Sequence, residues 1–296
     1  MGGWKTGNAD TSLSDTLHSC RVVVGLATVL SAGLYLGWSL VLYGRLAFPV
    51  DDAWIHQTLA RNLVRYGQWA YNPGQLTTGS TAPLWTLLIT PGHLLPGGVP
   101  LWTYGLGLLF MALTGWEVVR LLEGWGLGGW EVGRLGDWQV GKSGLPIMAG
   151  VLVVLEWHLP WMALSGMETT LFTFLALRLL ERYLGDGSLL EVGLLGGLLI
   201  LTRPEGVIPL GLVVAHALWE GRGSRVALRR ALLIAGTAMV LVSPWLAFNL
   251  AVTGQPMPAT FYAKHKEMVT RSGVLTVLEN WVILGGISLI SGGQLL

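Results

Sequence analysis

Long apolar runs, separated by short polar segments, dominate this chain of 296 residues. A helix that crosses a lipid bilayer needs about 20 mostly apolar residues. Seven runs reach or approach this length: 22–43, 102–122, 145–161, 169–183, 189–202, 207–219 and 231–252. An eighth run, 282–296, ends with the chain, and from it we expect that a carboxy-terminal part is missing. The pattern predicts an all-α, polytopic transmembrane bundle with about seven spans and a partial eighth.

The composition agrees with a lipid environment. Hydrophobic residues make up 52% of the chain and charged residues only 12%, whereas soluble domains carry about 25% charged residues. The 42 glycines fit closely packed spans, and the 15 tryptophans fit the headgroup region. A net charge of +1 without a basic stripe excludes a nucleic-acid partner. The single Cys20 excludes an internal disulfide and a cysteine-rich metal site.

The polar amino terminus has no compact apolar core followed by a small-residue cleavage site. We therefore interpret 1–21 as a cytoplasmic tail and 22–296 as a membrane domain whose first span is retained. Cytoplasmic loops are rich in Lys and Arg, and the densest basic cluster is Arg222, Arg225, Arg229 and Arg230. Counting outward from that loop places 48–100, 159–168, 251–280 and the turn 203–206 outside.

The first outer loop, 48–100, predicts two interfacial helices. Asp51-Asp52 opens a helix that ends at Gly67, and 83–95 is too short to cross and is interrupted by Pro91-Gly92. The first helix has an apolar stripe and a more polar face with Thr58, Arg61 and Arg65; the stripe consists of Ile55, Leu59, Leu63 and Tyr66. The Asp pair is either a helix N-cap or, with one carboxylate to spare, a base or metal ligand.

Further charged residues lie in the other outer segments. Glu168 complements a helix dipole or belongs to a site, and Arg203-Glu205 is a self-neutralising pair or belongs to the same site. Tyr262, Lys264 and His265 lie in the last outer segment, where solvated charge is the alternative. Their shared location on one membrane face predicts an acid/base and phosphate-binding site built by several loops.

Four stretches resemble the GT-C superfamily of multi-span glycosyltransferases, and most closely its mycobacterial terminal arabinofuranosyltransferases. In chain order they are DDAWIHQTLARNLVRYGQWAYNPGQLTTGSTAPLWTLLI, SGMETTLF, LTRPEG and GQPMPATFYAK. The resemblance covers most of the chain from Asp51 to Lys264. It implies a polyprenyl-phosphate sugar donor, a glycan, glycolipid or glycoprotein acceptor, and inverting transfer on the extracytoplasmic face of the cell membrane.

The resemblance also implies roles for individual residues. Asp51 or Asp52 is the general base, with Asp51 favoured because it lies nearer the membrane, and Glu168 positions the acceptor or contacts a metal. Arg203 and Lys264 bind the donor phosphate, with Arg61 and His265 behind them, while Glu205 and Tyr262 belong to the acceptor side. Mg²⁺ or Mn²⁺ on Asp51 and Glu168 is a possible cofactor, and no nucleotide is required.

The chain also departs from the family. Ala259 stands where the family has asparagine in a Pro-Asn-Thr step, and the family's carboxy-terminal domain is expected but missing. Two other classes stay open. A transporter or channel would carry ionisable residues within its spans, and here only Glu156 and His158 approach that pattern. An inactive relative that acts as a membrane scaffold is the other class. The inner loop 123–144 has no predicted role.

Overall fold

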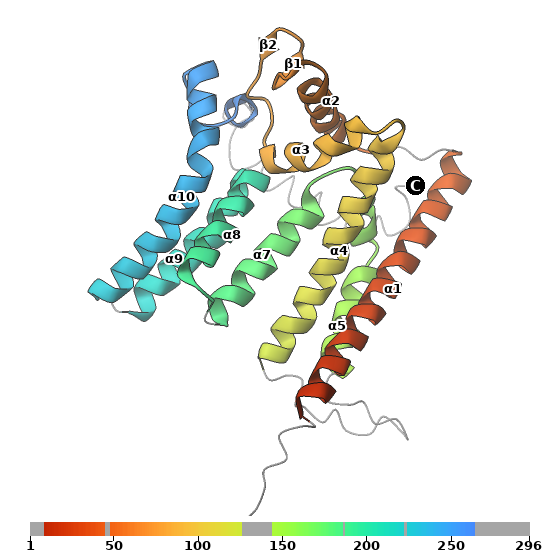
Figure 1. Cartoon of the computed structure of the whole chain (residues 1–296), viewed down its shortest axis with the longest axis vertical. Helices are drawn as coiled ribbons and strands as arrows, with labels where there is room; N and C mark the ends of the chain where they lie inside the picture. Colours follow the sequence, from red (N-terminus) through yellow and green to blue (C-terminus); the bar gives the residue numbers. More distant parts are fainter. Residues whose placement is uncertain (1–8, 45–47, 126–143, 186, 222–223, 264–296) are drawn as a thin grey trace, which may run out of the picture.

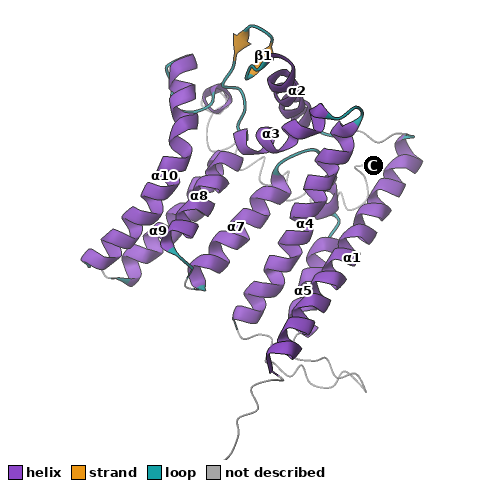
Figure 2. Cartoon of the chain, in the orientation of Figure 1, coloured by secondary structure: helices purple, strands orange, loops and turns teal. Residues whose placement is uncertain are grey.

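The computed structural model describes residues 9–44, 48–125, 144–185, 187–221 and 224–263. These residues form a helical bundle with a small cap at one end (Figures 1 and 2). The helices are α1 (Ala9–Tyr43), α2 (Asp51–Tyr66), α3 (Pro83–Ile89), α4 (Gly98–Gly124), α5 (Gly144–Leu155), α6 (His158–Leu164), α7 (Thr169–Leu184), α8 (Leu189–Thr202), α9 (Val207–Glu220) and α10 (Arg225–Thr253), with 3-10 helices η1 (Thr90–Leu94) and η3 (Pro204–Gly206). Strands β1 (Ala70–Asn72) and β2 (Gln75–Leu76) form an antiparallel hairpin. The predicted all-α class is confirmed.

The long helices run alternately toward and away from the cap. Figure 1 shows α1, α5, α8 and α10 rising toward α2 and α3, while α4, α7 and α9 descend from them. The described parts of the segments predicted to lie outside therefore gather at one end of the bundle, which we call the α2–α3 end. The opposite end carries the α7–α8 and α9–α10 connections.

Three helical segments are long and apolar enough to cross a membrane: Arg21–Tyr43 within α1, α4 and α10. A fourth span arises if α5 and α6, bent by 57° at their junction, count as one. Helices α7, α8 and α9 have 16, 14 and 14 residues, which at about 1.5 Å per residue is shorter than the roughly 30 Å hydrocarbon layer. Length and composition thus support three or four of the seven predicted spans. The run 282–296 lies outside the described residues.

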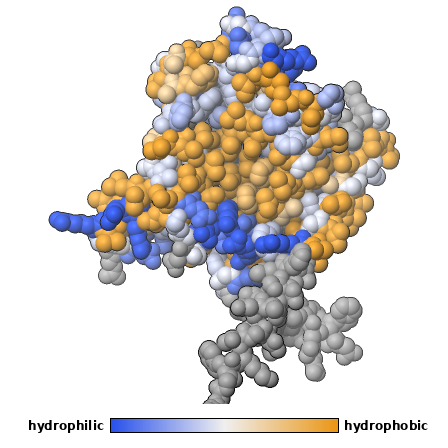
Figure 3. Space-filling view, viewed as in Figure 1, coloured by the Kyte–Doolittle hydropathy of each residue, from blue (hydrophilic) through white to orange (hydrophobic). Residues whose placement is uncertain are grey.

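The surface of the bundle is apolar between two polar ends. Figure 3 shows a hydrophobic band around the middle, with hydrophilic residues above and below it. On α1 the side chains of Leu26, Val29 and Leu34 are 65%, 68% and 66% exposed, and on α10 Val240 is 74% exposed. A soluble protein rarely exposes contiguous apolar patches of this kind, whereas lipid accepts them. These are the helices of a multi-pass membrane protein.

Glycines allow the helices to pack closely. A Cβ atom at Gly107 of α4 would lie 1.8 Å from the carbonyl oxygen of Ala163, and one at Gly193 of α8 would lie 2.7 Å from that of Ile234. Small residues at such crossings let two backbones approach, which is the main source of packing between helices in lipid. The expectation drawn from the glycine content is confirmed at these contacts.

Helix α2 turns a different face toward the bundle from the one that we expect from sequence. It ends as predicted at Gly67, whose φ of 65° places it in the left-handed region. Its buried residues are Ala53, His56, Gln57, Leu59, Ala60 and Asn62. Of the predicted apolar stripe only Leu59 is buried, and Tyr66 is 53% exposed. Polar contacts decide the face: Gln57 Nε2 donates to Thr103 Oγ1 of α4 (2.9 Å), and Gln57 Oε1 accepts from His93 Nε2 of η1 (2.9 Å).

Helix α3 and η1 confirm the predicted short helical segment that is interrupted near Pro91-Gly92. Pro83 begins α3, and Pro91 lies in the first turn of η1, where a missing amide proton is tolerated. Figure 1 shows α3 lying across the ends of the bundle helices rather than along them. Trp85, Ile89 and Ala60 bury completely in one apolar cluster with residues of α7, α8, α9 and α10. The two cap helices therefore cover the ends of the helices that follow them in the chain.

The end opposite the cap is held by ion pairs among α4, α7 and α8. Arg178 Nη1 lies 3.2 Å from the buried Glu117 carboxylate and 3.1 Å from Glu181. Arg120 contacts Glu181 at 2.6 Å, and Arg182 of α7 contacts Glu191 of α8 at the same distance. This ion-pair end fixes the three helices relative to one another.

Candidate active site

A tight turn between α6 and α7 places Glu168 at the α2–α3 end. Gly166 has φ of 82°, and a Cβ atom there would lie 2.7 Å from the ring of Phe48, so the turn requires glycine. The Ser165 hydroxyl donates to the Met162 carbonyl (2.8 Å) and accepts from the Met167 amide (3.3 Å). The buried indole of Trp85 donates to the Gly166 carbonyl (2.9 Å). Glu168 is consequently fixed as the N-cap residue of α7.

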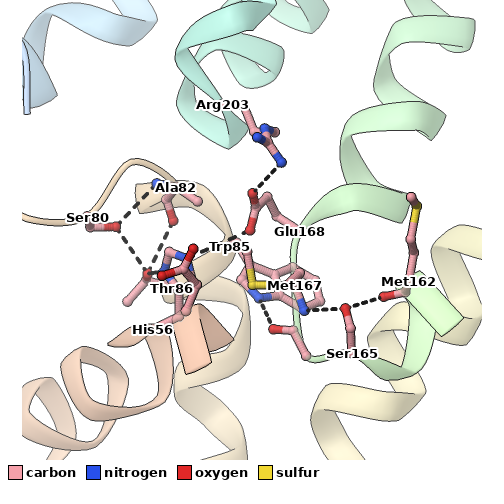
Figure 4. A network of polar contacts seen from close by, with 12 residues as sticks. His56, Ser80, Ala82, Trp85, Thr86, Met162, Ser165, Met167, Glu168 and Arg203 are labelled. Atoms are coloured by element: carbon pink, nitrogen blue, oxygen red, sulfur yellow. Dashed lines mark hydrogen bonds and ion pairs between the residues drawn. The ribbon is translucent and has the colours of Figure 1, made fainter. Parts of the chain in front are cut away.

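Glu168 is buried and has one cation beside it. Its side chain makes no cap hydrogen bond, and its position at the amino terminus of α7 is the one expected for an acid that complements the helix dipole. Oε1 lies 3.2 Å from Arg203 Nη1, and Arg203 Nη2 lies 3.5 Å from the exposed Glu205. Figure 4 shows the Arg203 and Glu168 side chains pointing toward each other from the ends of α8 and α7. The Glu168 Oε2 atom has no hydrogen-bond partner among the described residues.

His56 of α2 approaches Glu168 from the other side. Its Nε2 atom lies 3.7 Å from Glu168 Oε2, and its Nδ1 atom lies 3.0 Å from Thr86 Oγ1. Thr86 Oγ1 also lies 3.2 Å from the Ala82 carbonyl oxygen, to which it donates. The direction of the His56–Thr86 bond depends on the tautomer of the imidazole. Ser80 Oγ lies 3.4 Å from Thr86 Oγ1 and completes this row of polar groups (Figure 4).

Burial controls the charge of both groups. Burial lowers the pKa of His56 to about 4, and the positive charge of Arg203 adds to this, although Asp52 partly offsets it. The imidazole is therefore neutral at pH 7, and its contact with Glu168 is not an ion pair. Burial also raises the pKa of Glu168; hydrogen bonding to its own backbone amide and the charge of Arg203 oppose this, while Glu205 and Asp52 reinforce it.

The structure separates the two aspartates of the predicted pair. Val50 is the N-cap of α2 and both aspartates lie in its first turn, so the N-cap interpretation is wrong. Asp51 Oδ1 accepts the backbone amide proton of Asp52 (3.0 Å). Asp52 acts electrostatically on both His56 and Glu168, and it lies four residues before His56, on the same helix face. This placement favours Asp52, whereas the sequence favours Asp51.

The remaining predicted residues do not join Glu168 in the described parts of the chain. Arg61 lies five residues after His56, about 140° around the helix, and contacts Asn62 Oδ1 (3.3 Å). Tyr262 lies in a helical turn over 259–263, which is held by hydrogen bonds from the Ala259 amide to the carbonyl and hydroxyl oxygens of Thr78 (3.2 and 3.3 Å). Lys264 and His265 lie outside the described residues.

The donor set does not fit a resident Mg²⁺ or Mn²⁺. Across the described ranges, no group of three or more His, Cys, Asp or Glu side chains is placed to hold a metal ion. The predicted pair of Asp51 and Glu168 lacks a third ligand of this kind, and Arg203 already neutralises the Glu168 carboxylate.

Sequence reasoning missed His56, Ser80 and Thr86, although all three lie in the first motif stretch. For His56 a signal exists, because the four-residue spacing from Asp52 places both on one face of a predicted helix. For Ser80 and Thr86 no local signal exists, since hydroxyl residues in a loop and a short helix are common. Comparison of the chain with family models, with curated proteins and with solved structures finds no match.

Proposed function

We propose that the chain is a GT-C-type glycosyltransferase that moves a sugar from a polyprenyl phosphate to a glycan, glycolipid or glycoprotein acceptor on the extracytoplasmic face of the cell membrane. The observation that carries this proposal is the Arg203–Glu168–His56 group beside Asp52. A cation, a buried carboxylate, a neutral imidazole and an exposed carboxylate meet at one end of a membrane bundle. The order and spacing of the four motif stretches support the same class.

Arg203 suits the leaving group of this reaction. When the glycosidic bond breaks, its electron pair passes to the lipid phosphate, whose negative charge must be stabilised. A guanidinium has five N–H donors. Only some of those of Arg203 face Glu168 and Glu205, and the side chain is 36% exposed. The remaining donors bind phosphate oxygens, while Glu168 holds the planar group in orientation. Lys264 and His265 keep their predicted role as further cations.

Asp52 suits the base. The attacking acceptor hydroxyl forms a bond to the anomeric carbon and gives its proton to the Asp52 carboxylate, a transfer that contributes about 10² to 10⁴-fold in rate. The exposed position of Asp52 leaves it open to an acceptor. Glu168 and His56 are positioning residues, because both are buried and bind Arg203 or the α3 helix. Inversion follows from a single displacement of this kind.

The interfacial cap suits a lipid-linked donor. Helix α3 lies across the helix ends (Figure 1), and exposed apolar residues such as Leu87 and Leu94 face outward near it. A polyprenyl tail remains in the lipid while its phosphate reaches Arg203. No nucleotide-binding fold is required, because the sugar is already activated by the phosphate.

One observation favours a transporter as the second candidate. The break between α5 and α6, with its 57° bend, carries the paired side chains of Glu156 and His158. Transporters place ion and substrate sites at such breaks. However, both side chains are about half exposed, and no second broken pair was found among the described residues. An inactive scaffold would share the fold and lack both activities.

Reconstituted vesicles containing the full chain test the proposal. We would supply radiolabelled polyprenyl-phosphate pentofuranose or hexopyranose and octyl-linked disaccharides as acceptors, and measure labelled product. Wild-type protein should form product, Asp52→Asn should lose at least about 100-fold in rate, and Asp51→Asn, the matched control, should retain most of it. Equal activity of wild type and Asp52→Asn would remove Asp52 as the base. Uptake of free sugar or ions into the vesicles without any transfer would favour the transporter.

A further inference from the structure

Three aromatic side chains form a platform at the α2–α3 end, apart from the Glu168 group. Trp69 follows α2, and Trp245 and Phe248 lie in the last turns of α10. The Trp69 and Trp245 rings are 5.4 Å apart at 64°, and the Trp245 and Phe248 rings are stacked, 5.4 Å apart at 18°. All three residues are half-buried. Their rings therefore present a partly open apolar surface at the end of a membrane helix.

Two buried polar atoms, one on the platform and one on the residue next to Phe248, have no partner among the described residues. Asn249, next to Phe248, is fully buried, and its Nδ2 atom donates to the Pro256 carbonyl (3.0 Å). That bond fixes the amide orientation, so the unpaired atom is the acceptor Oδ1. Trp69 Nε1, a donor, is also buried without a partner among the described residues. Buried polar atoms normally have partners, so an unpaired acceptor on Asn249 and an unpaired donor on Trp69 fit a ligand with both donors and acceptors.

A single loop joins this platform to the Glu168 group. The Thr77 amide donates to the Trp69 carbonyl (3.1 Å), and Thr78, which is buried, accepts from the Ala259 amide. Two residues later, Ser80 contacts Thr86, the partner of His56. The platform and the proposed catalytic group thus lie on the two ends of the loop 77–82.

We propose that Trp69, Trp245, Phe248 and Asn249 form a saccharide-binding subsite that holds a ring of the acceptor. Aromatic rings contribute large apolar faces on which the C–H face of a sugar packs. A few fixed polar atoms then orient the ligand: a sugar hydroxyl donates to Asn249 Oδ1, and another accepts from Trp69 Nε1. This subsite rests on the proposed glycosyl transfer. The residues that it proposes for acceptor binding are different from Glu205 and Tyr262, which the sequence analysis predicts.

An aromatic belt at the membrane surface is the competing explanation for the tryptophans. A belt explains the positions of the rings, but it does not explain why the Asn249 oxygen and the buried Trp69 N–H have no partner among the described residues. Trp219, 84% exposed on α9 near the opposite end, is a matched control because it fits a belt and has no such surroundings. The comparison of Trp245→Ala with Trp219→Ala therefore separates the two explanations.

The kinetic test uses the vesicle assay with an octyl-linked disaccharide as the acceptor. Trp245→Ala and Asn249→Ala should each raise the acceptor KM by about tenfold, the factor that a typical single contact produces, and leave the donor KM unchanged. Trp219→Ala should change neither. Trp245→Phe, which retains an aromatic face, should recover most of the acceptor affinity, and melting temperatures verify that each variant is folded. Unchanged acceptor KM values in folded Trp245→Ala would overturn the subsite.

A binding measurement separates failure of the subsite from failure of the proposed function. Saturation-transfer NMR detects the octyl disaccharide on the protein without a donor. Binding by wild type and by Asp52→Asn, but not by Trp245→Ala, supports the subsite even if no sugar is transferred. If sugar transfer depends on Asp52 but Trp245→Ala still binds the disaccharide, the proposed function is kept and the subsite is rejected. Absence of disaccharide binding to the wild-type protein rejects it as well.

Discussion

The Arg203 guanidinium lies 3.2 Å from Glu168 Oε1 and joins the end of α8 to the start of α7. The two residues are far apart in sequence, and each lies beside a turn in its own segment: Gly166 comes before Glu168, and Pro204 comes after Arg203. The contact neutralises a buried carboxylate and leaves part of the guanidinium exposed. The proposed binding of a donor phosphate depends on this exposed part of the guanidinium.

Arg203→Lys should weaken donor binding while preserving the fold. Lysine keeps the positive charge but loses the planar fork that spans a carboxylate and a phosphate together, so we expect the donor KM to rise about tenfold. Glu205→Gln is the control, because its contact with Arg203 is longer and exposed, and it should change the donor KM less than about twofold. Equal effects of the two substitutions would contradict a phosphate role for Arg203. Initial rates at varied donor concentration measure both.

His56 should make the fold acid-sensitive. Its pKa falls from 6.5 to about 4 on burial, so the unfolded chain binds more protons between these values and stability decreases as the pH falls from about 6.5 to 4. The loss approaches about 3 kcal/mol at most. Glu168, with its raised pKa, has the opposite sign. The test is therefore the difference in melting temperature between wild type and His56→Gln: the wild type should lose more on acidification, and parallel curves would count against a buried neutral imidazole.

Gly166→Ala should disturb the turn that carries Glu168. The residue has φ of +82° and its new Cβ would lie 2.7 Å from the Phe48 ring. Gly254→Ala is the control, since its φ is +71° and nothing lies within 4 Å. The control should lose about 1 kcal/mol from its backbone conformation alone, and Gly166→Ala should lose more and transfer sugar more slowly. Chemical unfolding and the vesicle assay measure the two effects. Equal losses would show that the Phe48 contact relaxes freely.

Arg178→Met should destabilise the ion-pair end. It leaves the Glu117 carboxylate, which is 3% exposed, without its nearest cation, and stranding a buried charge costs about 3 to 5 kcal/mol. Arg120 remains 3.9 Å from Glu117, so the loss should lie near the lower limit. The double variant Arg178→Met with Glu117→Leu should recover much of the stability. Denaturant unfolding checks this, and a double variant as unstable as the single one would contradict it.

Labelling should place the two ends on opposite sides of the membrane. In a Cys20→Ser background, an impermeant maleimide added to intact cells should react with Tyr71→Cys at the hairpin. Gly185→Cys, at the end of α7, should react only after permeabilisation. The orientation follows from the basic residues between α9 and α10. Labelling of both positions in intact cells would exclude the proposed topology.

Local chemistry made some features predictable from the sequence. The end of α2 at Gly67 and the break after α3 at Pro91 depend on single residues with restricted or unusual backbone conformations. The gathering of the motif segments at one end followed from counting apolar runs. The buried face of α2 was not predictable, because Gln57 selects it through partners 36 and 46 residues away. Helix ends were thus predictable because a single residue determines them, whereas the buried face of α2 depends on residues distant in sequence.

The candidate site was predictable only in part for the same reason. Topology placed Asp52, Glu168 and Arg203 on one side, but not the choice between Asp51 and Asp52, which depends on the rotation of α2. The row of Thr86 and Ser80 behind His56 depends on how α3 lies across the bundle. The span count is limited by the shortness of α7, α8 and α9, which apolar composition alone does not resolve.

Ion pairs join α7 and α8 at both ends: Glu168 with Arg203 at the α2–α3 end, and Arg182 and Arg178 with Glu191 at the other. Because the contacts at the far end do not involve Arg203, a substitution of Arg203 leaves α7 and α8 joined there. A loss of sugar transfer in such a variant can therefore be assigned to the candidate site rather than to separation of the two helices.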